Sequence, residues 1–195
     1  MPTVYEKADE EVRELIAEVM RTHHPVLTCV GLRLDVLMAE VRDANGALLA
    51  RPAVKAHGYE ADAKIKAIPL DQRTAGLGDA LLVIDAQRWG LMSGAQQRAL
   101  IDHELYHVQV EREGGGFLEI GSDGQLDGTP RLDDIDRPKL KLRLHDWQLG
   151  GFIDIARRHG ESAPEVIAAR SVRDDGGQYV WDWASDKVVA KLAIA

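Results

Sequence analysis

The strongest structural requirement in this sequence comes from residues 98–111, RALIDHELYHVQVE. This segment contains His103, Glu104 and His107 in the order H-E-x-x-H. At about 3.6 residues per turn, two histidines four positions apart lie on the same side of a helix, and both imidazoles can reach one zinc ion at about 2.0 to 2.1 Å. The spacing therefore predicts a helix and, on that helix, a metal site.

The residues around the motif also favour a helix. Ser93 and Gln96 have the S-x-x-Q spacing of a capping box, which marks a helix N-terminus. Apolar residues then define one helix face while the H-E-x-x-H residues lie on another, so we expect an amphipathic helix that buries one side and exposes the motif on the other. The apolar face consists of Ile101, Leu105 and Val108.

Composition restricts the class of protein. Apolar residues make up 45% and charged residues 29% of the 195 residues, which is typical of one globular domain with extensions. The formal net charge of -8 argues against nucleic acid as a partner, because nucleic-acid-binding surfaces are usually basic. No apolar run is long enough to span a membrane, no signal peptide is evident, and the single Cys29 cannot form an internal disulfide. We therefore expect a cytoplasmic protein without a membrane partner.

The first part of the chain predicts a helix followed by strands. Periodic apolar residues indicate a helix from Ala8 to about Thr22, after which His24 is expected to be a linker residue. Residues 32–41 resemble a strand, and Asn45-Gly46 can close a hairpin onto residues 47–50.

Further along, the continuous apolar run Ala80–Ile84 predicts a strand that is covered on both faces. Residues 111–138 are rich in Gly, Asp and Pro, which predicts a long loop or a small hairpin excursion. KLKLRL at 139–144 alternates as a half-buried strand does, and a helix that Gly160 can cap is expected to follow. Strands and helices mixed in this way predict an α+β fold.

A catalytic zinc site normally has three protein ligands, so a third ligand is required. The downstream candidates are Glu119, His145 and Asp146. We choose His145, because it lies where the predicted strand ends and a helix begins, a rigid joint that can hold an imidazole. Asp146 is the alternative ligand, and otherwise would be the N-cap of that helix or a carboxylate that orients a ligand histidine.

The residue types fit metal-assisted hydrolysis. Zinc lowers the pKa of a water molecule to about 7 and polarises a carbonyl group. Glu104 lies beside the ligands, so its carboxylate can take the proton of that water and pass it to the leaving amine. We expect Zn²⁺ as cofactor and a protein or peptide as substrate. Tyr59, Tyr179 and Arg143 are candidates for stabilising the oxyanion.

Four segments together resemble the phage metallopeptidase family, whose members carry H-E-x-x-H and a later H-D followed by a helix with phenylalanine. The resemblance covers about residues 20–165, and the segments are HGYEADAKIKAI, DALLVIDAQRW, QRALIDHELYHV and RLHDWQLGGFIDIARRHG. The sequence is also similar, more distantly, to the SprT-like zinc peptidases. It departs from them at His145-Asp146, where they have His-Gly, and it lacks zinc-ribbon cysteines, so a DNA-repair role is not supported.

By this resemblance, His103, His107 and His145 would be metal ligands, Glu104 the catalytic base and Phe152 a packing residue. The implied fold is zincin-like: an active-site helix beneath a small mixed sheet whose edge strand pairs with extended substrate. We expect an N-terminal helix at 1–25, a zincin-like domain at 26–165, and an extension at 166–195 that packs on it.

Two functions remain in view. The first is a zinc-dependent peptidase of phage or prophage origin that acts on a protein inside the bacterial cell. The second is a non-catalytic protein in which the zincin scaffold binds a host factor through its acidic surface. A Glu104→Gln variant separates the two, because it would abolish hydrolysis and leave partner capture unchanged.

Overall fold

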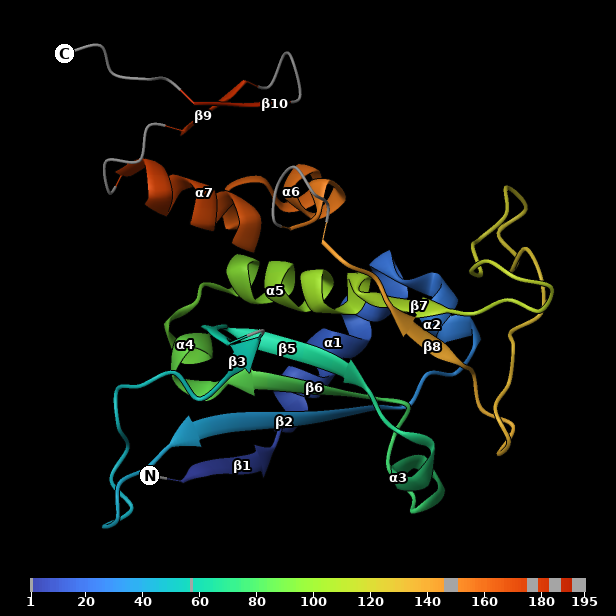
Figure 1. Ribbon diagram of the computed structural model, residues 1–195, viewed down its shortest axis with the longest axis horizontal. Helices are drawn as coiled ribbons and strands as arrows, with labels where there is room; N and C mark the ends of the chain where they lie inside the picture. The colour runs from blue at the N-terminus through green and yellow to red at the C-terminus, as the bar shows by residue number, and fades with distance from the viewer. Residues whose placement is uncertain (1, 57, 146–150, 175–178, 183–186, 191–195) are drawn as a thin grey trace. The chain divides into compact units, whose positions relative to one another are not determined.

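The computed structural model describes residues 2–56, 58–145, 151–174, 179–182 and 187–190, and it shows two units (Figure 1). The first unit comprises residues 1–143 and the second residues 144–195. The first unit contains a mixed sheet, helices and the H-E-x-x-H segment. Its secondary structure confirms the α+β class expected from the sequence.

The centre of the first unit is a four-stranded mixed sheet with the order β1-β2-β6-β5. The strands are β1 (Thr3–Lys7), β2 (Leu34–Val41), β5 (Ala63–Ala67) and β6 (Ala80–Asp85). Strand β6 runs parallel to β2, whereas β1 and β5 are antiparallel to their neighbours. The prediction for the apolar run at 80–84 is confirmed, because β6 lies between two strands and is buried along most of its length.

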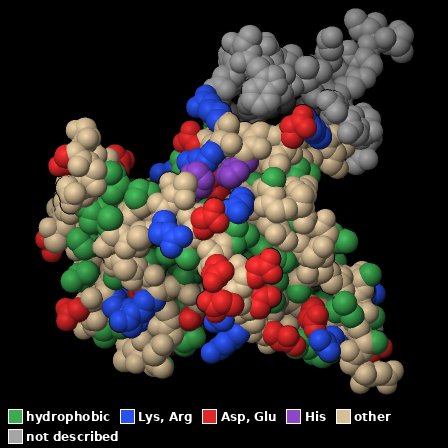
Figure 2. All heavy atoms as spheres, turned by 180° about the vertical axis from the view of Figure 1, so that it is seen from behind, with side chains coloured by type: hydrophobic (Ala, Val, Ile, Leu, Met, Phe, Trp, Pro, Cys, Tyr) green, Lys and Arg blue, Asp and Glu red, His purple; other side chains and the backbone are tan. Residues whose placement is uncertain are grey.

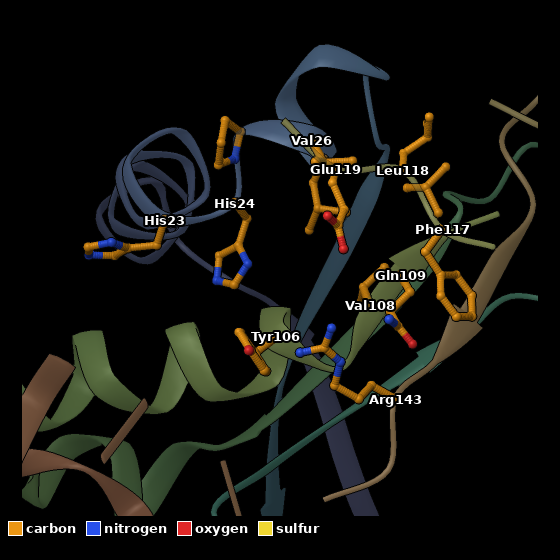
Figure 3. Close-up of a pocket in the computed structure, with 13 residues that line it drawn as sticks. His23, His24, Val26, Tyr106, Val108, Gln109, Phe117, Leu118, Glu119 and Arg143 are labelled. Atoms are coloured by element: carbon orange, nitrogen blue, oxygen red, sulfur yellow. The ribbon is translucent and has the colours of Figure 1, made fainter. Parts of the chain in front are cut away.

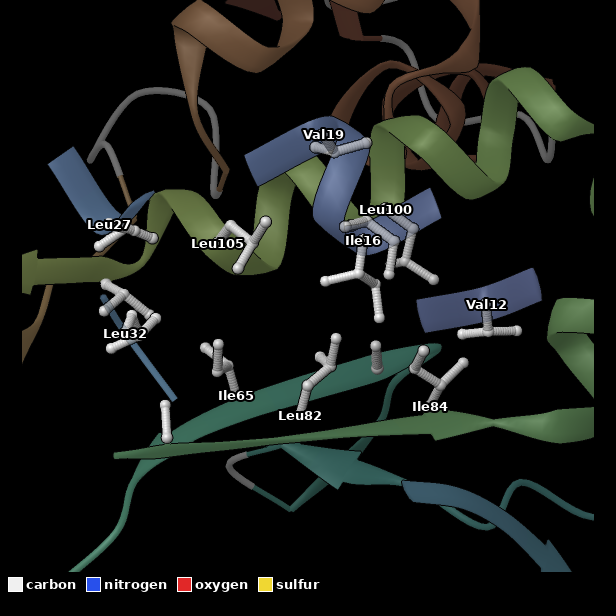
Figure 4. Packing of buried hydrophobic residues seen from close by; sticks show 14 of the residues in the cluster. Val12, Ile16, Val19, Leu27, Leu32, Ile65, Leu82, Ile84, Leu100 and Leu105 are labelled. Carbon is white, nitrogen blue, oxygen red and sulfur yellow. The ribbon is translucent and has the colours of Figure 1, made fainter. Parts of the chain in front are cut away.

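Two helices cover one face of this sheet, α1 (Glu10–His23) and α5 (Gly94–Tyr106) (Figures 1 and 4). Their apolar side chains point toward those of β5 and β6 and form the larger hydrophobic core of the unit. Ile16 and Leu105 from the helices, and Leu82 and Ile84 from β6, are among its members. The periodicity that predicted the first helix is therefore confirmed, and the side chain of Asp9 caps it by accepting the N–H of Val12 at 2.9 Å.

Shorter elements complete this part of the unit. Helix α2 is Pro25–Cys29, α3 is Leu70–Thr74 and α4 is Ala86–Leu91, while β3 (Lys55–Ala56) pairs with β4 (Tyr59–Glu60). A smaller cluster on the sheet joins Ala39 and Val83 to Val54 of the segment before β3. The expected turn at Asn45-Gly46 is present, with Gly46 at a φ of 82°, but a single bridge between Arg42 and Leu48 replaces the expected hairpin ladder.

The chain then makes a long excursion between two short strands, β7 (Val108–Val110) and β8 (Leu140–Leu142). These strands pair antiparallel, with Val108 opposite Leu142. Between them, residues 111–138 contain turns and isolated bridges but no strand among the described residues, as the sequence predicted. The excursion thus begins just after the C-terminus of α5, at β7, and ends at β8, which pairs with β7.

A buried ionic network ties the end of this excursion to the sheet. Arg73 pairs with Asp79 and, at 2.8 Å, with Asp133, while Arg137 pairs with Asp79 at 2.8 Å. Asp79 lies directly before β6, and Asp133 and Arg137 belong to the last turn before β8. Because all four side chains are at most 10% exposed, the network fixes where the chain re-enters at β8.

The second unit contains α6 (Ile153–His159), a 3-10 turn η1 (Gly160–Ser162), α7 (Pro164–Asp174) and the antiparallel pair β9 (Tyr179–Asp182) and β10 (Lys187–Ala190). Gly160 ends α6 with a φ of 52°, so the predicted cap is confirmed. The N-cap position of α6 is Phe152. The N-cap expected at Asp146 lies outside the described residues.

A carboxylate from another helix accepts a backbone N–H at the N-terminus of α6. Glu165 of α7 accepts the backbone N–H of Phe152 at 3.0 Å, and both residues are buried. Its side chain passes so close to Gly151 that a Cβ there would lie 1.9 Å from Cγ of Glu165. Only glycine fits at this position, which explains one glycine of the GG pair before the helix.

Candidate metal centre

Helix α5 carries His103 and Glu104 in its last turn, and His107 is its C-cap residue. The capping box predicted for Ser93 and Gln96 is present and starts this helix. His107 keeps helical backbone angles, with φ -63° and ψ -28°, so the two histidines remain on the same side. Their ring centroids are 5.2 Å apart, and they offer ligand nitrogens that lie within 4.8 Å of each other.

The orientation of His107 is set by Arg143, the residue directly after strand β8. Nδ1 of His107 lies 2.7 Å from the backbone carbonyl oxygen of Arg143, and the N–H of Arg143 donates to the carbonyl oxygen of His107 at 2.7 Å. A carbonyl oxygen can only accept, so Nδ1 carries a proton, and in the neutral ring Nε2 then has the lone pair. Ligand histidines in metal sites are commonly held in this way, with one ring nitrogen donating to a backbone carbonyl.

The surroundings of the motif differ from the amphipathic helix that the sequence predicted. From Ala99 to Leu105 every residue of α5 is buried, including His103 at 8% and Glu104 at 6% exposure. The expectation of one open face is therefore wrong. A physical reason within the first unit is that α5 packs against α1 and against β5, so more than one of its faces is covered. The side chains of His103 and Glu104 are thus buried, whereas His107 is half-buried.

His24, expected from the sequence to be a linker residue, also contacts a buried carboxylate next to the H-E-x-x-H motif. It does lie at the junction of α1 and α2, but its side chain is buried, and Nε2 is 2.7 Å from Oδ1 of Asp102. Asp102 is 0% exposed and directly precedes His103 on α5. Sequence analysis missed this pair, because its members are 78 residues apart and neither belongs to a recognised motif.

The candidate third ligands occupy different places. His145 belongs to the second unit, is exposed, and packs edge-on against Phe152 with ring centroids 5.0 Å apart, while Asp146 lies outside the described residues. Glu119 instead lines a pocket beside β7, together with Arg143. That His145 completes the ligand set stays a prediction.

The candidates for stabilising an oxyanion are also spread along the chain. Tyr59 of β4 is 79% exposed, and the side chain of Tyr179 lies outside the described residues. Arg143 is half-buried, and its guanidinium stacks 4.4 Å above the ring of Tyr106. Of the three, only Arg143 is bonded through its backbone to a histidine of the motif.

The residues present fit a zinc ion. Imidazoles are ligands that zinc prefers, the hydrogen bond to the Arg143 carbonyl orients the His107 ring, and Glu104 lies beside both histidines. The fold is α+β, and the site brings together two histidines that could hold a metal ion, with a carboxylate next to them on the same helix.

Comparison with known families agrees with this description. The family described as "Putative phage metallopeptidase" matches residues 4–174. The chain belongs to this family, as the resemblance in the sequence predicted. Searches of curated proteins and of solved structures found no match. Along the stretches that the structure describes, no helix combines the length and apolar character needed to cross a bilayer.

Proposed function

We propose that the protein is a zinc-dependent peptidase, encoded by a phage or prophage, that cleaves a protein or peptide inside the bacterial cell. His103, His107 and His145 hold the zinc, and Glu104 is the general base. The observation that carries the proposal is the pair of histidines at the end of α5, one of which is locked in a single tautomer by the Arg143 carbonyl.

The covalent chain supports His145 as the third ligand. Consecutive Cα atoms are about 3.8 Å apart, so the Cα of His145 can be at most about 7.6 Å from that of Arg143. Arg143 is bonded through both backbone groups to His107. The position of His145 along the chain therefore keeps it near the paired histidines. Asp146, one residue further on, is the alternative by the same reasoning.

The chemistry follows from the residue types. Bound zinc would supply Lewis acidity, which makes water a nucleophile near neutral pH and polarises a peptide carbonyl. Glu104 takes a proton from the attacking water and gives it to the leaving amine as the C–N bond breaks. The burial of Glu104 keeps bulk water away from this proton, and its place on a rigid helix fixes the carboxylate relative to the ligand histidines.

The sheet supports a zincin-like arrangement. Strand β5 is antiparallel to β6 and is the last strand of the four-stranded sheet, and α5 packs against it. Within the ranges that the structure describes, β5 has a strand partner in this sheet only on the β6 side. An extended peptide can add to such an edge through backbone hydrogen bonds and lie along the active-site helix.

A Glu104→Gln variant tests the proposal. Zinc-loaded wild-type protein should cleave peptides in a proteome-derived library read by mass spectrometry, whereas the variant should hold the same amount of zinc and lose cleavage. Zinc content is measured on the same samples. A wild-type protein that holds one zinc and cleaves nothing would reject the peptidase and favour the non-catalytic scaffold, and a variant with full activity would remove Glu104 as the base.

A further inference from the structure

A pocket of about 220 Å³ lies entirely within the first unit, and the residues on either side of His107 in the sequence, Tyr106 and Val108, line it (Figure 3). Drug-sized ligands usually occupy pockets of about 300–1,000 Å³, so this volume suits a single side chain. Apolar side chains from three parts of the chain form much of the wall, among them Val26 of α2, Val108 of β7 and Leu118 of the excursion.

Two residues that line the pocket are connected to the histidines of the proposed metal site. Tyr106 lines it and lies three positions after His103, so the two are neighbours on the surface of α5. Arg143 lines it as well and is the residue whose backbone holds His107. A substrate bound at the histidines would therefore have this pocket next to it.

Two charged groups face the pocket from different sides. Glu119 is exposed, and Figure 3 shows its carboxylate pointing into the pocket toward the side where Arg143 and Tyr106 lie. Throughout the residues that the structure describes, no cationic side chain pairs with this carboxylate. The Arg143 guanidinium stacks on the Tyr106 ring, and no described carboxylate pairs with it.

We infer that this pocket binds a lysine or arginine side chain of the substrate peptide, with Glu119 as the specificity-determining residue; the inference rests on the proposed peptidase function. The apolar walls pack against the aliphatic stem, and Glu119 pairs with the cationic end. Arg143 lies on the side nearer the histidines, where its N–H groups can donate to a backbone carbonyl of the same peptide.

The charge of the protein favours a cationic side chain over an anionic one. An acidic side chain in the pocket would meet the Glu119 carboxylate, and it would approach a chain with a formal net charge of -8. Acidic groups also gather into a patch on the surface shown in Figure 2. Such a surface attracts basic peptides and repels acidic ones before they bind.

Binding of small probes to the zinc-loaded protein tests the pocket without hydrolysis. The probes are the N-acetyl amides of lysine, norleucine and glutamate, and the readout is the methyl NMR signals of Val26, Val108 and Leu118. The lysine probe should saturate the shifts at a concentration at least about threefold lower than norleucine needs, the effect of a partly exposed ion pair. The glutamate probe should bind more weakly than either.

Glu119→Gln should remove the preference for lysine over norleucine. Glu113→Gln is the matched control, because Glu113 is exposed on the same excursion and does not line the pocket. Equal binding of lysine and norleucine, stronger binding of glutamate, or a lysine preference that survives in Glu119→Gln would each overturn the inference.

Cleavage of a peptide library links the pocket to the reaction. One position around the cleaved bond should be enriched in lysine and arginine, and Glu119→Arg should shift that position toward acidic residues. Cleavage without a basic preference overturns the inference and leaves the peptidase intact. Lysine-selective NMR shifts in a zinc-loaded wild-type protein that cleaves nothing would keep the pocket and reject the peptidase.

Discussion

Nδ1 of His107 and the backbone carbonyl oxygen of Arg143 lie 2.7 Å apart, although 36 residues separate them in the sequence. The histidine at the C-cap of α5 is therefore oriented by the residue that directly follows β8. Pairing of β7 with β8 and the orientation of the His107 ring are linked, because Arg143 directly follows β8 and makes both backbone contacts with His107.

Removal of His145 should weaken zinc binding strongly, because two imidazoles alone do not complete a tetrahedral site. We expect His145→Ala to lose most of its zinc on dialysis against a weak chelator, while wild type keeps one zinc per chain, as measured by atomic emission. Asp146→Ala is the control and should keep its zinc. The reverse pattern would make Asp146 the third ligand.

Acidification should destabilise the fold through Asp133. Burial alone would raise the pKa of this carboxyl, but the N–H groups of Arg137 and Ile135 and the charges of Arg73 and Arg137 outweigh it and hold the pKa below its ordinary value of 3.8. A lowered pKa in the folded state means that the ionised carboxylate stabilises the protein above the unfolded-state value, and that this contribution is lost as the pH falls through the folded-state value.

Urea unfolding between pH 7 and pH 3 measures this effect. The free energy of unfolding of wild type should fall more steeply below about pH 4 than that of Asp133→Asn, which lacks the titrating group. Asp134→Asn, at an exposed neighbouring position, should follow the wild-type curve. Parallel curves for wild type and Asp133→Asn would show that the ionic network does not act through this carboxyl.

The interior of β6 should be sensitive to loss of volume. Leu82 is 0% exposed and lies between the sheet and the two covering helices. Leu82→Ala should lower the free energy of unfolding by about 2–5 kcal/mol. Leu91→Ala, at a residue that is 88% exposed, should change it by less than about 0.5 kcal/mol. Chemical denaturation of both variants checks the difference, and similar values would contradict the placement of Leu82 in the core.

The buried pair of His24 and Asp102 should contribute to stability as a unit. His24→Ala should cost about 3 kcal/mol, because it takes a partner from a fully buried carboxylate. Combining it with Asp102→Asn should cost clearly less than the sum of the two single changes. Strictly additive costs in urea denaturation would show that the two side chains do not depend on each other.

The elements that could be predicted from the sequence are those whose signal lies within a short segment of the chain. The periodicity of α1, the capping box at Ser93 and the apolar run of β6 are each contained in a short window, and all three are confirmed. The spacing of His103 and His107 likewise follows from helix geometry alone. The family was recognised because its motifs are also short.

Features that depend on distant residues were missed. Strand β1 has mostly exposed, mixed residues, and it forms because β2 offers an edge that no local pattern reveals. The burial of residues 99–105 of α5 involves packing against α1 and β5, which lie far from it in the sequence. The start of α6 at Ile153 depends on Glu165 accepting the N–H of Phe152, a contact with a helix further along the chain.

The larger hydrophobic core is drawn from residues between Ala8 and Leu118, with partly buried residues up to Leu140 packed against it. Every one of these residues precedes His145 in the sequence. The interior of the first unit therefore contains no part of the proposed third ligand. Binding of the proposed metal would follow on a scaffold whose core is already folded.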